Sequence, residues 1–206
     1  MLPGQVLLTP AALMSTLPHQ IRLIGGQWKR TRLGVPGMPG LRPTPDRVRE
    51  TLFNWLGQDL AGWRALDAFA GTGALGLEAA SRGAQSVLLV EQDARLAAAL
   101  RQHQQRLSAS AVQVLRGDGV AALHSQPAGS LDVVFLDPPF AAASLYAPAL
   151  AAAAKALRPG GFVYLEADAS WQGRPEAASF TLRRHLKAGA VHAHLFCKPL
   201  PTEEKP

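Results

Sequence analysis

The sequence contains one cysteine, Cys197, among 206 residues, and no hydrophobic run long enough to span a bilayer. A single cysteine excludes a framework of internal disulfides and fits a reducing compartment. Residues 1–19 lack the basic start of a secretory signal, and prolines interrupt their apolar stretches. We therefore expect a soluble cytoplasmic protein without a membrane partner, in which residues 1–19 and 201–206 are flexible tails.

Acidic residues are outnumbered, because 15 Asp and Glu stand against 21 Lys and Arg and leave a net charge of +6. The imbalance is greatest in residues 20–50, where Asp46 and Glu50 are the only acids. The basic residues of this segment are Arg22, Lys29, Arg30, Arg32, Arg42, Arg47 and Arg49. Such a concentration is typical of a surface that binds nucleic acid, although a run of charges is often only a solvated surface.

Two short strand-like runs lie within residues 21–33, on either side of Gly25-Gly26. A glycine pair supplies the positive φ of a tight turn, so we predict a β-hairpin here. Trp28 stands next to two cations, Lys29 and Arg30. An aromatic ring in this position can stack on bases or anchor the hairpin to the core, and the sequence leaves both roles open.

A helix is predicted after the Gly- and Pro-rich stretch 34–43. Thr44 is a suitable N-cap, and Pro45 suits the first helical position. The expected apolar stripe is Val48, Leu52 and Trp55 or Leu56, and Gly57 would end the helix. This arrangement would leave Arg42, Arg47 and Arg49 available to solvent or to nucleic acid.

From Trp63 onwards, strand-like runs alternate with helical ones. The predicted strands are 64–69, 86–91, 111–116, 131–136 and 160–166, followed by an antiparallel pair at 180–187 and 190–197. Strands that alternate with helices predict a parallel sheet covered on both faces, which is a doubly wound α/β fold. We expect residues 20–58 to form a docking extension and residues 59–200 to form the main domain.

A glycine-rich loop joins the first of these strands to a helix. Gly71, Gly73 and Gly76 fit the pattern G-x-G-x-x-G, in which the backbone approaches a ligand at a helix N-terminus. Glu91 ends the next strand, where it could bind ribose hydroxyls. By itself this pattern is as compatible with NAD as with any other cofactor that carries adenosine.

Two acids favour a positively charged cofactor over a dinucleotide. Asp67 precedes the glycines, where its charge would repel a pyrophosphate but attract an ammonium group. Asp118 follows strand 111–116 and could accept a hydrogen bond from an adenine amine. The alternative for Asp118 and Glu91 is ordinary capping of the helices that follow them.

The run Leu131–Leu136 is apolar throughout except for Asp132, and Asp137-Pro138-Pro139-Phe140 follows it. Such a run predicts a buried parallel strand, and two prolines must end it because they lack the N–H that a ladder needs. The Asp137 carboxylate and the Pro138 carbonyl would then lie at the sheet edge beside the Phe140 ring. Two acceptors next to a flat apolar face suit a planar amino group, such as the exocyclic amine of a base.

These motifs resemble, in order, those of class I S-adenosylmethionine methyltransferases that act on exocyclic amines: the loop Asp67–Gly76, Glu91, Asp118 and Asp137–Phe140. The segments 21–33 and 41–54 narrow the resemblance to the bacterial RsmD family, because 41–54 contains the more specific pattern Arg-Pro-Thr-x-Asp-Arg-Val-Arg-Glu. The similarity extends from residue 20 to about residue 200. That family methylates N2 of one guanine in 16S ribosomal RNA.

The resemblance implies a Rossmann-like fold with a mostly parallel seven-stranded sheet and an antiparallel last strand, preceded by the hairpin and helix. It implies S-adenosylmethionine as cofactor and 16S rRNA, in a 30S subunit or an assembly intermediate, as partner; we expect a monomer. The implied catalytic residues are Asp137, Pro138 and Phe140, and the cofactor-binding residues are Asp67, Phe69, Gly71, Gly73, Gly76, Glu91 and Asp118. The implied RNA-binding residues are Arg22, Trp28, Lys29, Arg30, Arg32, Arg42 and Arg47.

Several residues are given no catalytic role. His192 and His194 would share one face of a strand and Cys197 the other, and no fourth ligand is evident, so we expect no metal site. Glu166 and Asp168 are interpreted as surface acids, and Trp55 and Trp63 as core residues. Three alternative functions stay open: an amine methyltransferase acting on DNA adenine N6 or on protein, a non-catalytic RNA-binding assembly factor, and a dehydrogenase.

Overall fold

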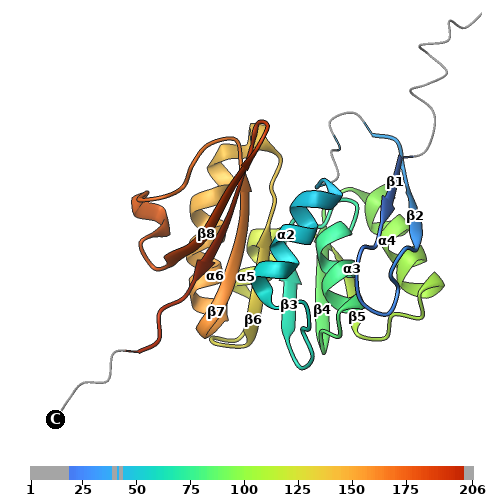
Figure 1. Cartoon of the computed structure of the whole chain (residues 1–206), viewed down its shortest axis with the longest axis horizontal. Coiled ribbons are helices and arrows are strands. Elements are labelled where there is room, and N and C mark those ends of the chain that lie inside the picture. The colour runs from blue at the N-terminus through green and yellow to red at the C-terminus, as the bar shows by residue number, and fades with distance from the viewer. Residues whose placement is uncertain (1–18, 39–40, 42–43, 202–206) are drawn as a thin grey trace, which may run out of the picture.

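A computed structural model describes residues 19–38, 41 and 44–201, which form a seven-stranded sheet between two layers of helices (Figure 1). The strand order is β5-β4-β3-β6-β7-β9-β8. The strands are β3 (Arg64–Asp67), β4 (Ser86–Glu91), β5 (Val112–Arg116), β6 (Leu131–Leu136), β7 (Leu157–Ala167), β8 (Thr181–Ala188) and β9 (Val191–Cys197). The pairs from β5 to β7 are parallel, and β9 runs antiparallel to both β7 and β8. The predicted fold is confirmed.

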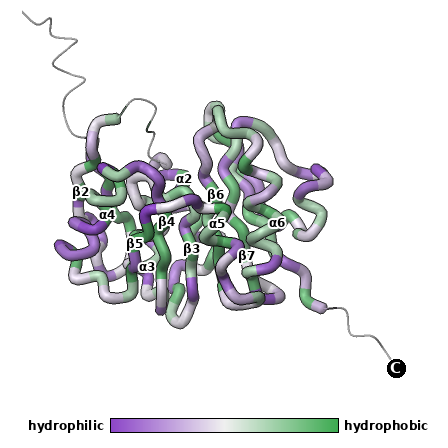
Figure 2. The backbone as a smooth tube through the Cα atoms, turned by 180° about the vertical axis from the view of Figure 1, so that it is seen from behind, coloured by the Kyte–Doolittle hydropathy of each residue, from purple (hydrophilic) through white to green (hydrophobic). Residues whose placement is uncertain are grey.

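The central strand β6 is buried at every position, as its apolar sequence predicts. Its side chains alternate between two cores: Val133 and Phe135 enter the core on one face, Val134 and Leu136 the core on the other. The first core is covered by α2 (Asp46–Leu56), α3 (Ala74–Ser81) and α4 (Ala94–Arg106), the second by α5 (Gly119–His124) and α6 (Tyr146–Ala156). Figure 2 shows this hydrophobic centre as green tube in the middle strands.

Strand β7 begins earlier than predicted, at Leu157 rather than at residue 160. The ladder with β6 shifts register between Leu131 and Val133, so residues 158–161 form a bulge within the strand. Gly160 adopts a φ of 76° there, a conformation that suits glycine. The Pro-Gly-Gly sequence therefore bends the strand without ending it.

The predicted hairpin is present as β1 (His19–Arg22) and β2 (Arg32–Val35), which pair antiparallel. The predicted tight turn at Gly25-Gly26 is wrong, because residues 23–31 form a longer loop. The glycine pair instead allows the loop to approach the end of α3: a Cβ on Gly26 would lie 1.8 Å from the Ser81 carbonyl oxygen. The N–H of Gln27 donates to that same oxygen at 2.7 Å.

Helix α2 begins one residue later than predicted, at Asp46 instead of Pro45. Pro45 occupies the N-cap position with φ −56° and ψ 145°, and no side chain caps the helix, so the prediction of Thr44 as N-cap is wrong. Gly57 ends the helix as predicted, with a φ of 97° and its N–H bonded to the Phe53 carbonyl. The Thr44 hydroxyl has a different partner, described below.

The hairpin and α2 share the first core with the main sheet. Ile21 and Leu33 from the hairpin and Leu52 from α2 are buried in the same cluster as Phe135. Residues 20–58 are thus folded onto the main domain, and their role as a docking extension stays a prediction. The predicted tails fall mostly on residues 1–18 and 202–206, outside the described residues. Within the described part of the chain, no helix combines the length and the apolar character that a bilayer crossing requires.

Candidate active site

Asp67 ends β3 and is buried, with 1% of its surface exposed. One carboxylate oxygen, Oδ2, accepts the N–H of Gly76 at 3.0 Å. A glycine is needed at position 76, because a Cβ there would lie 2.1 Å from Leu89 Cδ2 and 3.2 Å from Asp67 Oδ2. The other oxygen, Oδ1, is buried and has no hydrogen-bond partner among the described residues. Burial raises the pKa of Asp67 to about 7, and repulsion from Glu91 adds to the rise while the Gly76 N–H opposes it.

The glycine loop continues from Asp67 and is fixed by Glu91. Gly71 and Gly73 have φ angles of 52° and 80°, which favour glycine, and Gly73 is the N-cap of α3. Glu91 Oε2 accepts the Gly71 N–H at 2.8 Å, and its Oε1 accepts the Asp93 N–H at 2.8 Å. Glu91 thus connects the end of β4 to the loop, while its predicted contact with ribose stays a prediction. Phe69 is half-buried beside the second core.

Asp118 caps α5, in agreement with the alternative interpretation of this residue. Its Oδ1 accepts the Ala121 N–H at 2.7 Å, and its Oδ2 accepts from Gln92 Nε2 at 3.0 Å. Gly119 lies directly against the end of β3, where a Cβ would be 1.9 Å from the Ala68 carbonyl oxygen. This close approach brings the exposed Asp118 to the same edge of the sheet as the glycine loop. Its contact with an adenine amine stays a prediction.

Asp137 lies at this edge as well, because β6 is the neighbour of β3 and Phe135 pairs with Asp67. Asp137 is half-buried, Pro138 is buried, and Pro139 is exposed and extended at φ −52° and ψ 132°. Phe140 begins the 3-10 segment η1 (Phe140–Leu145). The chain therefore ends the strand at the prolines as predicted, and the roles predicted for Pro138 and Phe140 stay predictions.

Glu166 also belongs to the site, and its prediction as a surface acid is wrong. Only 3% of Glu166 is exposed, because it lies on the face of β7 that also carries the buried Tyr164. The Tyr164 hydroxyl donates to Glu166 Oε1 at 2.7 Å. Burial raises the pKa of Glu166, while the hydroxyls of Tyr164 and Thr44 oppose the rise. Asp168, two residues later, is exposed as expected.

The charges of Asp67, Asp137 and Glu166 act on one another across neighbouring strands. Burial raises the pKa of Asp137 well above its ordinary value, and the charges of Glu166 and Asp67 raise it further. Thr44 is buried, and its hydroxyl donates to Asp137 Oδ2 at 3.4 Å, which lowers that pKa. Thr44 is a site residue that the sequence analysis missed, because its side chain also matched a helix cap.

Tyr146, at the start of α6, carries no motif that marks it in the sequence. Its side chain is buried, and its hydroxyl has no hydrogen-bond partner among the described residues. Burial raises the pKa of Tyr146, and the charges of Asp137, Asp168 and Glu166 raise it further. The Tyr146 hydroxyl is therefore a neutral hydrogen-bond donor close to Asp137 and Glu166.

The predicted RNA-binding residues that the structure describes lie on the hairpin strands, on the loop between them and on α2. Arg22, Lys29, Arg30, Arg32 and Arg47 are exposed and are called the basic surface below. Trp28 is half-buried and packs against the first core, which supports its anchoring role. Arg22 and Arg32 stand directly opposite each other in the hairpin, and Asp46 offsets this like-charge pairing by binding Arg22 at 2.7 Å. Arg42 lies outside the described residues.

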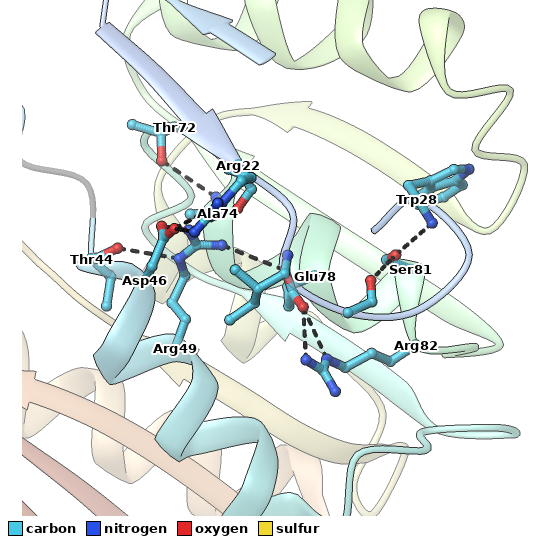
Figure 3. Close-up of polar contacts among 12 residues, drawn as sticks. Arg22, Trp28, Thr44, Asp46, Arg49, Thr72, Ala74, Glu78, Ser81 and Arg82 are labelled. Atoms are coloured by element: carbon cyan, nitrogen blue, oxygen red, sulfur yellow. Dashed lines mark hydrogen bonds and ion pairs between the residues drawn. The ribbon is translucent and has the colours of Figure 1, made fainter. Parts of the chain in front are cut away.

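The prediction that Arg49 is exposed is wrong, because only 1% of its surface is exposed. It lies on the same helical stripe as Leu52, Phe53 and Leu56. Its guanidinium binds Asp46 at 2.5 Å and lies 3.5 Å from Glu78 (Figure 3). Arg49 is thus a structural residue and not part of the basic surface.

The histidines on β9 have a third neighbour. His185 from β8 joins His192 and His194, with one nitrogen of each within 4.8 Å of the others. The two ring nitrogens of His194 already face the backbone: Nδ1 lies 3.3 Å from the Leu165 carbonyl oxygen, and Nε2 accepts the Trp171 N–H at 3.1 Å. His194 would lose one of these bonds by binding a metal, which supports the expectation of no metal site. That expectation stays a prediction.

Comparison with known proteins now identifies the family. The family described as "Conserved hypothetical protein 95" matches residues 21–197. The chain belongs to this family. A relative from Escherichia coli (strain K12), named ribosomal RNA small subunit methyltransferase D, is 48% identical over 121 residues, which are 59% of this chain and 61% of that protein. The protein of the same name from Haemophilus influenzae is 40% identical over 184 residues, 86% of this chain and 93% of that one.

The fold is also that of solved relatives. The structure of the methyltransferase yhhF from Escherichia coli, 37% identical, superposes with a TM-score of 0.77 and covers 88% of this chain and 99% of that one. The resemblance to the RsmD family is therefore confirmed, and so is the Rossmann-like fold of class I methyltransferases. The match to the Escherichia coli relative named above spans about three fifths of that protein, 61%.

Proposed function

We propose that the protein transfers a methyl group from S-adenosylmethionine to the exocyclic N2 amine of a guanine in 16S ribosomal RNA. The observation that carries the proposal is the family match over residues 21–197, whose relatives are named as small-subunit rRNA methyltransferases. The match includes both the buried acids and the basic surface. The acidic strand ends supply a site for a cation and for an amine, and the basic surface supplies a site for RNA.

The residues present fit the proposed cofactor. Asp67 Oδ1 is a buried acceptor without a partner among the described residues, which costs free energy until a donor such as an ammonium group binds it. Gly71 and Gly73 bring the backbone of the loop to the N-terminus of α3 in conformations that side chains rarely adopt. Asp67, the glycine loop and Glu91 would hold the cofactor. When bound, S-adenosylmethionine supplies a methyl group that its sulfonium makes electrophilic.

Asp137 would orient the acceptor amine. Its carboxylate and the Pro138 carbonyl are hydrogen-bond acceptors, and two acceptors can fix both N–H groups of an amine so that its lone pair faces the methyl group. As the N–CH₃ bond forms and the S–CH₃ bond breaks, the amine becomes cationic and must lose one proton. Asp137 would accept that proton. Because the methylated amine is strongly acidic, Asp137 need not be a strong base.

The basic surface would hold the RNA backbone. Arg22, Lys29 and Arg30 line a groove of about 240 Å³ together with Asp46 and Glu50. Exposed cations of this density neutralise phosphates and give affinity without sequence specificity. We therefore assign docking to the basic surface and selection of the amine to the sheet edge.

The test supplies radiolabelled S-adenosylmethionine with three acceptors separately: 16S rRNA, 30S particles and duplex DNA. Labelled nucleic acid is digested to nucleosides, and the product is identified by mass. N2-methylguanosine from rRNA or particles supports the proposal, and the better acceptor indicates the stage of assembly. N6-methyladenine from DNA would replace the proposed substrate. No transfer despite cofactor binding would point to another amine, and no cofactor binding would favour an assembly factor.

A further inference from the structure

Arg49 fixes the backbone just before α2 from inside the protein. A fully buried guanidinium is costly unless its donors are satisfied, and here they are. Arg49 donates to the Thr44 carbonyl at 3.2 Å, the Arg22 carbonyl at 2.9 Å and Asp46 Oδ1 at 2.5 Å. Figure 3 shows Thr44, Asp46 and Arg49 grouped at the N-terminal end of α2. Thr44 is therefore held in place although it caps no helix.

The side chain of Thr44 faces Asp137 at the edge of the sheet. Thr44 is 6% exposed, and its hydroxyl lies 3.4 Å from Asp137 Oδ2. Hydrogen bonding by the same hydroxyl also lowers the pKa of Glu166. A separation of 3.4 Å is long, but hydrogen bonds in catalytic sites commonly shorten when the substrate binds.

We propose that Thr44 is a positioning residue for Asp137: its hydroxyl fixes one carboxylate oxygen and leaves the other free to face the acceptor amine. The inference rests on the proposed function. Asp137 comes directly after the end of β6, and rotation of its side chain would turn the carboxylate away from the amine, so a donor to one oxygen would fix its orientation. Thr44 comes from the segment that also carries the basic surface, which gives that segment a role in the chemistry as well as in docking.

The neighbours of Asp137 predict the sign of a pH effect. Asp67 on β3 and Glu166 on β7 disfavour its ionised form, and the Thr44 hydroxyl favours that form. The hydroxyls of Tyr164 on β7 and Tyr146 on α6 stay neutral, because burial raises the pKa of each. Removing the Thr44 hydroxyl should therefore raise the pKa of Asp137.

The experiment compares Thr44→Val, which removes the hydroxyl at nearly constant volume, with Thr44→Ser, which keeps it. We expect Thr44→Val to lower kcat at least tenfold, because one hydrogen bond to a charged group is removed, with KM for RNA and cofactor affinity within about twofold. The acidic limb of the kcat profile should move to higher pH. Thr44→Ser should retain kcat within about threefold of wild type.

Two outcomes overturn the inference: a Thr44→Val enzyme with the wild-type kcat and acidic limb, or a Thr44→Ser enzyme as impaired as Thr44→Val. If Thr44→Val does not fold, Thr44→Ala replaces it. Failure of the proposed function is distinguished by the wild-type protein, which would then yield no N2-methylguanosine in the same assay. In that case a carboxyl NMR titration of Asp137 in both proteins decides, and equal pKa values would refute the hydrogen bond.

Discussion

The guanidinium of Arg49 lies 3.5 Å from the carboxylate of Glu78, and both side chains are buried. Glu78 is on α3 and also binds Arg82 at 2.9 Å and the Ile24 N–H at 2.9 Å. One carboxylate thus joins the hairpin loop and helix α2 to helix α3 of the main domain. The N-terminal segment is held by buried charges as well as by apolar packing.

Replacing Glu78 with leucine should destabilise the protein by about 3–5 kcal/mol, because it leaves buried cations without their carboxylate. Arg82 would keep Gln58 as a side-chain partner, while Arg49 would keep Asp46. Urea denaturation monitored by tryptophan fluorescence measures the change. The exposed Glu50→Ala is the control and should change stability by less than about 0.5 kcal/mol. A Glu78→Leu protein as stable as the control would mean that packing alone holds the segment.

Asp67 should make the protein less stable as the pH rises. Its pKa is about 7 in the folded protein and 3.8 ordinarily, so the folded state binds the proton more tightly than the unfolded state. The stability that this proton contributes is complete below pH 3.8, declines as the pH rises and is lost above about pH 7. For a buried group with this shift the loss is on the order of 4 kcal/mol.

Asp67→Asn removes the titrating group and keeps an oxygen for the Gly76 N–H. The variant should therefore melt at a higher temperature than wild type at about pH 8, and the difference should shrink as the pH falls towards 3.8. Thermal denaturation without cofactor measures this. The same variant should bind S-adenosylmethionine at least tenfold more weakly, because the amide cannot attract an ammonium group. A variant less stable than wild type at the higher pH would contradict a raised pKa for Asp67.

Asp137→Ala should lower turnover at least 100-fold, because it removes both the proposed orientation of the amine and the acceptor of its proton. Cofactor affinity should stay within about threefold, since the cofactor is assigned to Asp67, the glycine loop and Glu91. Labelled methyl transfer and isothermal titration calorimetry measure the two quantities. Asp168→Ala, an exposed acid after β7, is the control and should keep turnover within about twofold. Near-normal turnover in Asp137→Ala would remove this residue from the mechanism.

The positions of the strands along the chain could be predicted because each strand carries its own local signal. The apolar run of β6 ends at two prolines, and the glycines after β3 mark a strand that turns into a helix. The signals for buried charges are weaker. Arg49 stands at helical spacing from Leu52, Phe53 and Leu56, so the stripe itself indicates burial, whereas the charge of a guanidinium favours exposure.

Other features depend on partners that are distant in the sequence. Thr44 satisfies the local rule for an N-cap, and only the position of Asp137, 93 residues away in the sequence, gives its hydroxyl another role. Glu166 lies near the end of an apolar strand and could have been its exposed end, yet β9 pairs with β7 as far as Ala167. The predicted turn at Gly25-Gly26 is wrong for the same reason, since Ser81 on α3 is what those glycines approach. Such interactions are tertiary and leave no local pattern.

The basic surface should govern the salt dependence of RNA binding. Lys and Arg that neutralise phosphates release counterions, so each phosphate that a variant no longer neutralises should flatten the slope of log K against log salt by about 0.7–0.9. Arg30→Ala with Arg32→Ala should therefore weaken binding to 16S rRNA and flatten the slope by about 1.5, with cofactor affinity unchanged. Filter binding between roughly 50 and 200 mM salt, a range over which such binding weakens steeply, measures it.

Arg183→Ala with Arg184→Ala is the matched control, because it removes the same charge from exposed positions. These residues lie on β8, at one edge of the sheet, whereas the hairpin packs beside α4 towards the other edge (Figure 1). If only total charge attracted RNA, both double variants would bind it equally weakly. A flatter slope in the hairpin variant alone would locate the phosphates at the basic surface, and an unchanged slope there would place the RNA elsewhere.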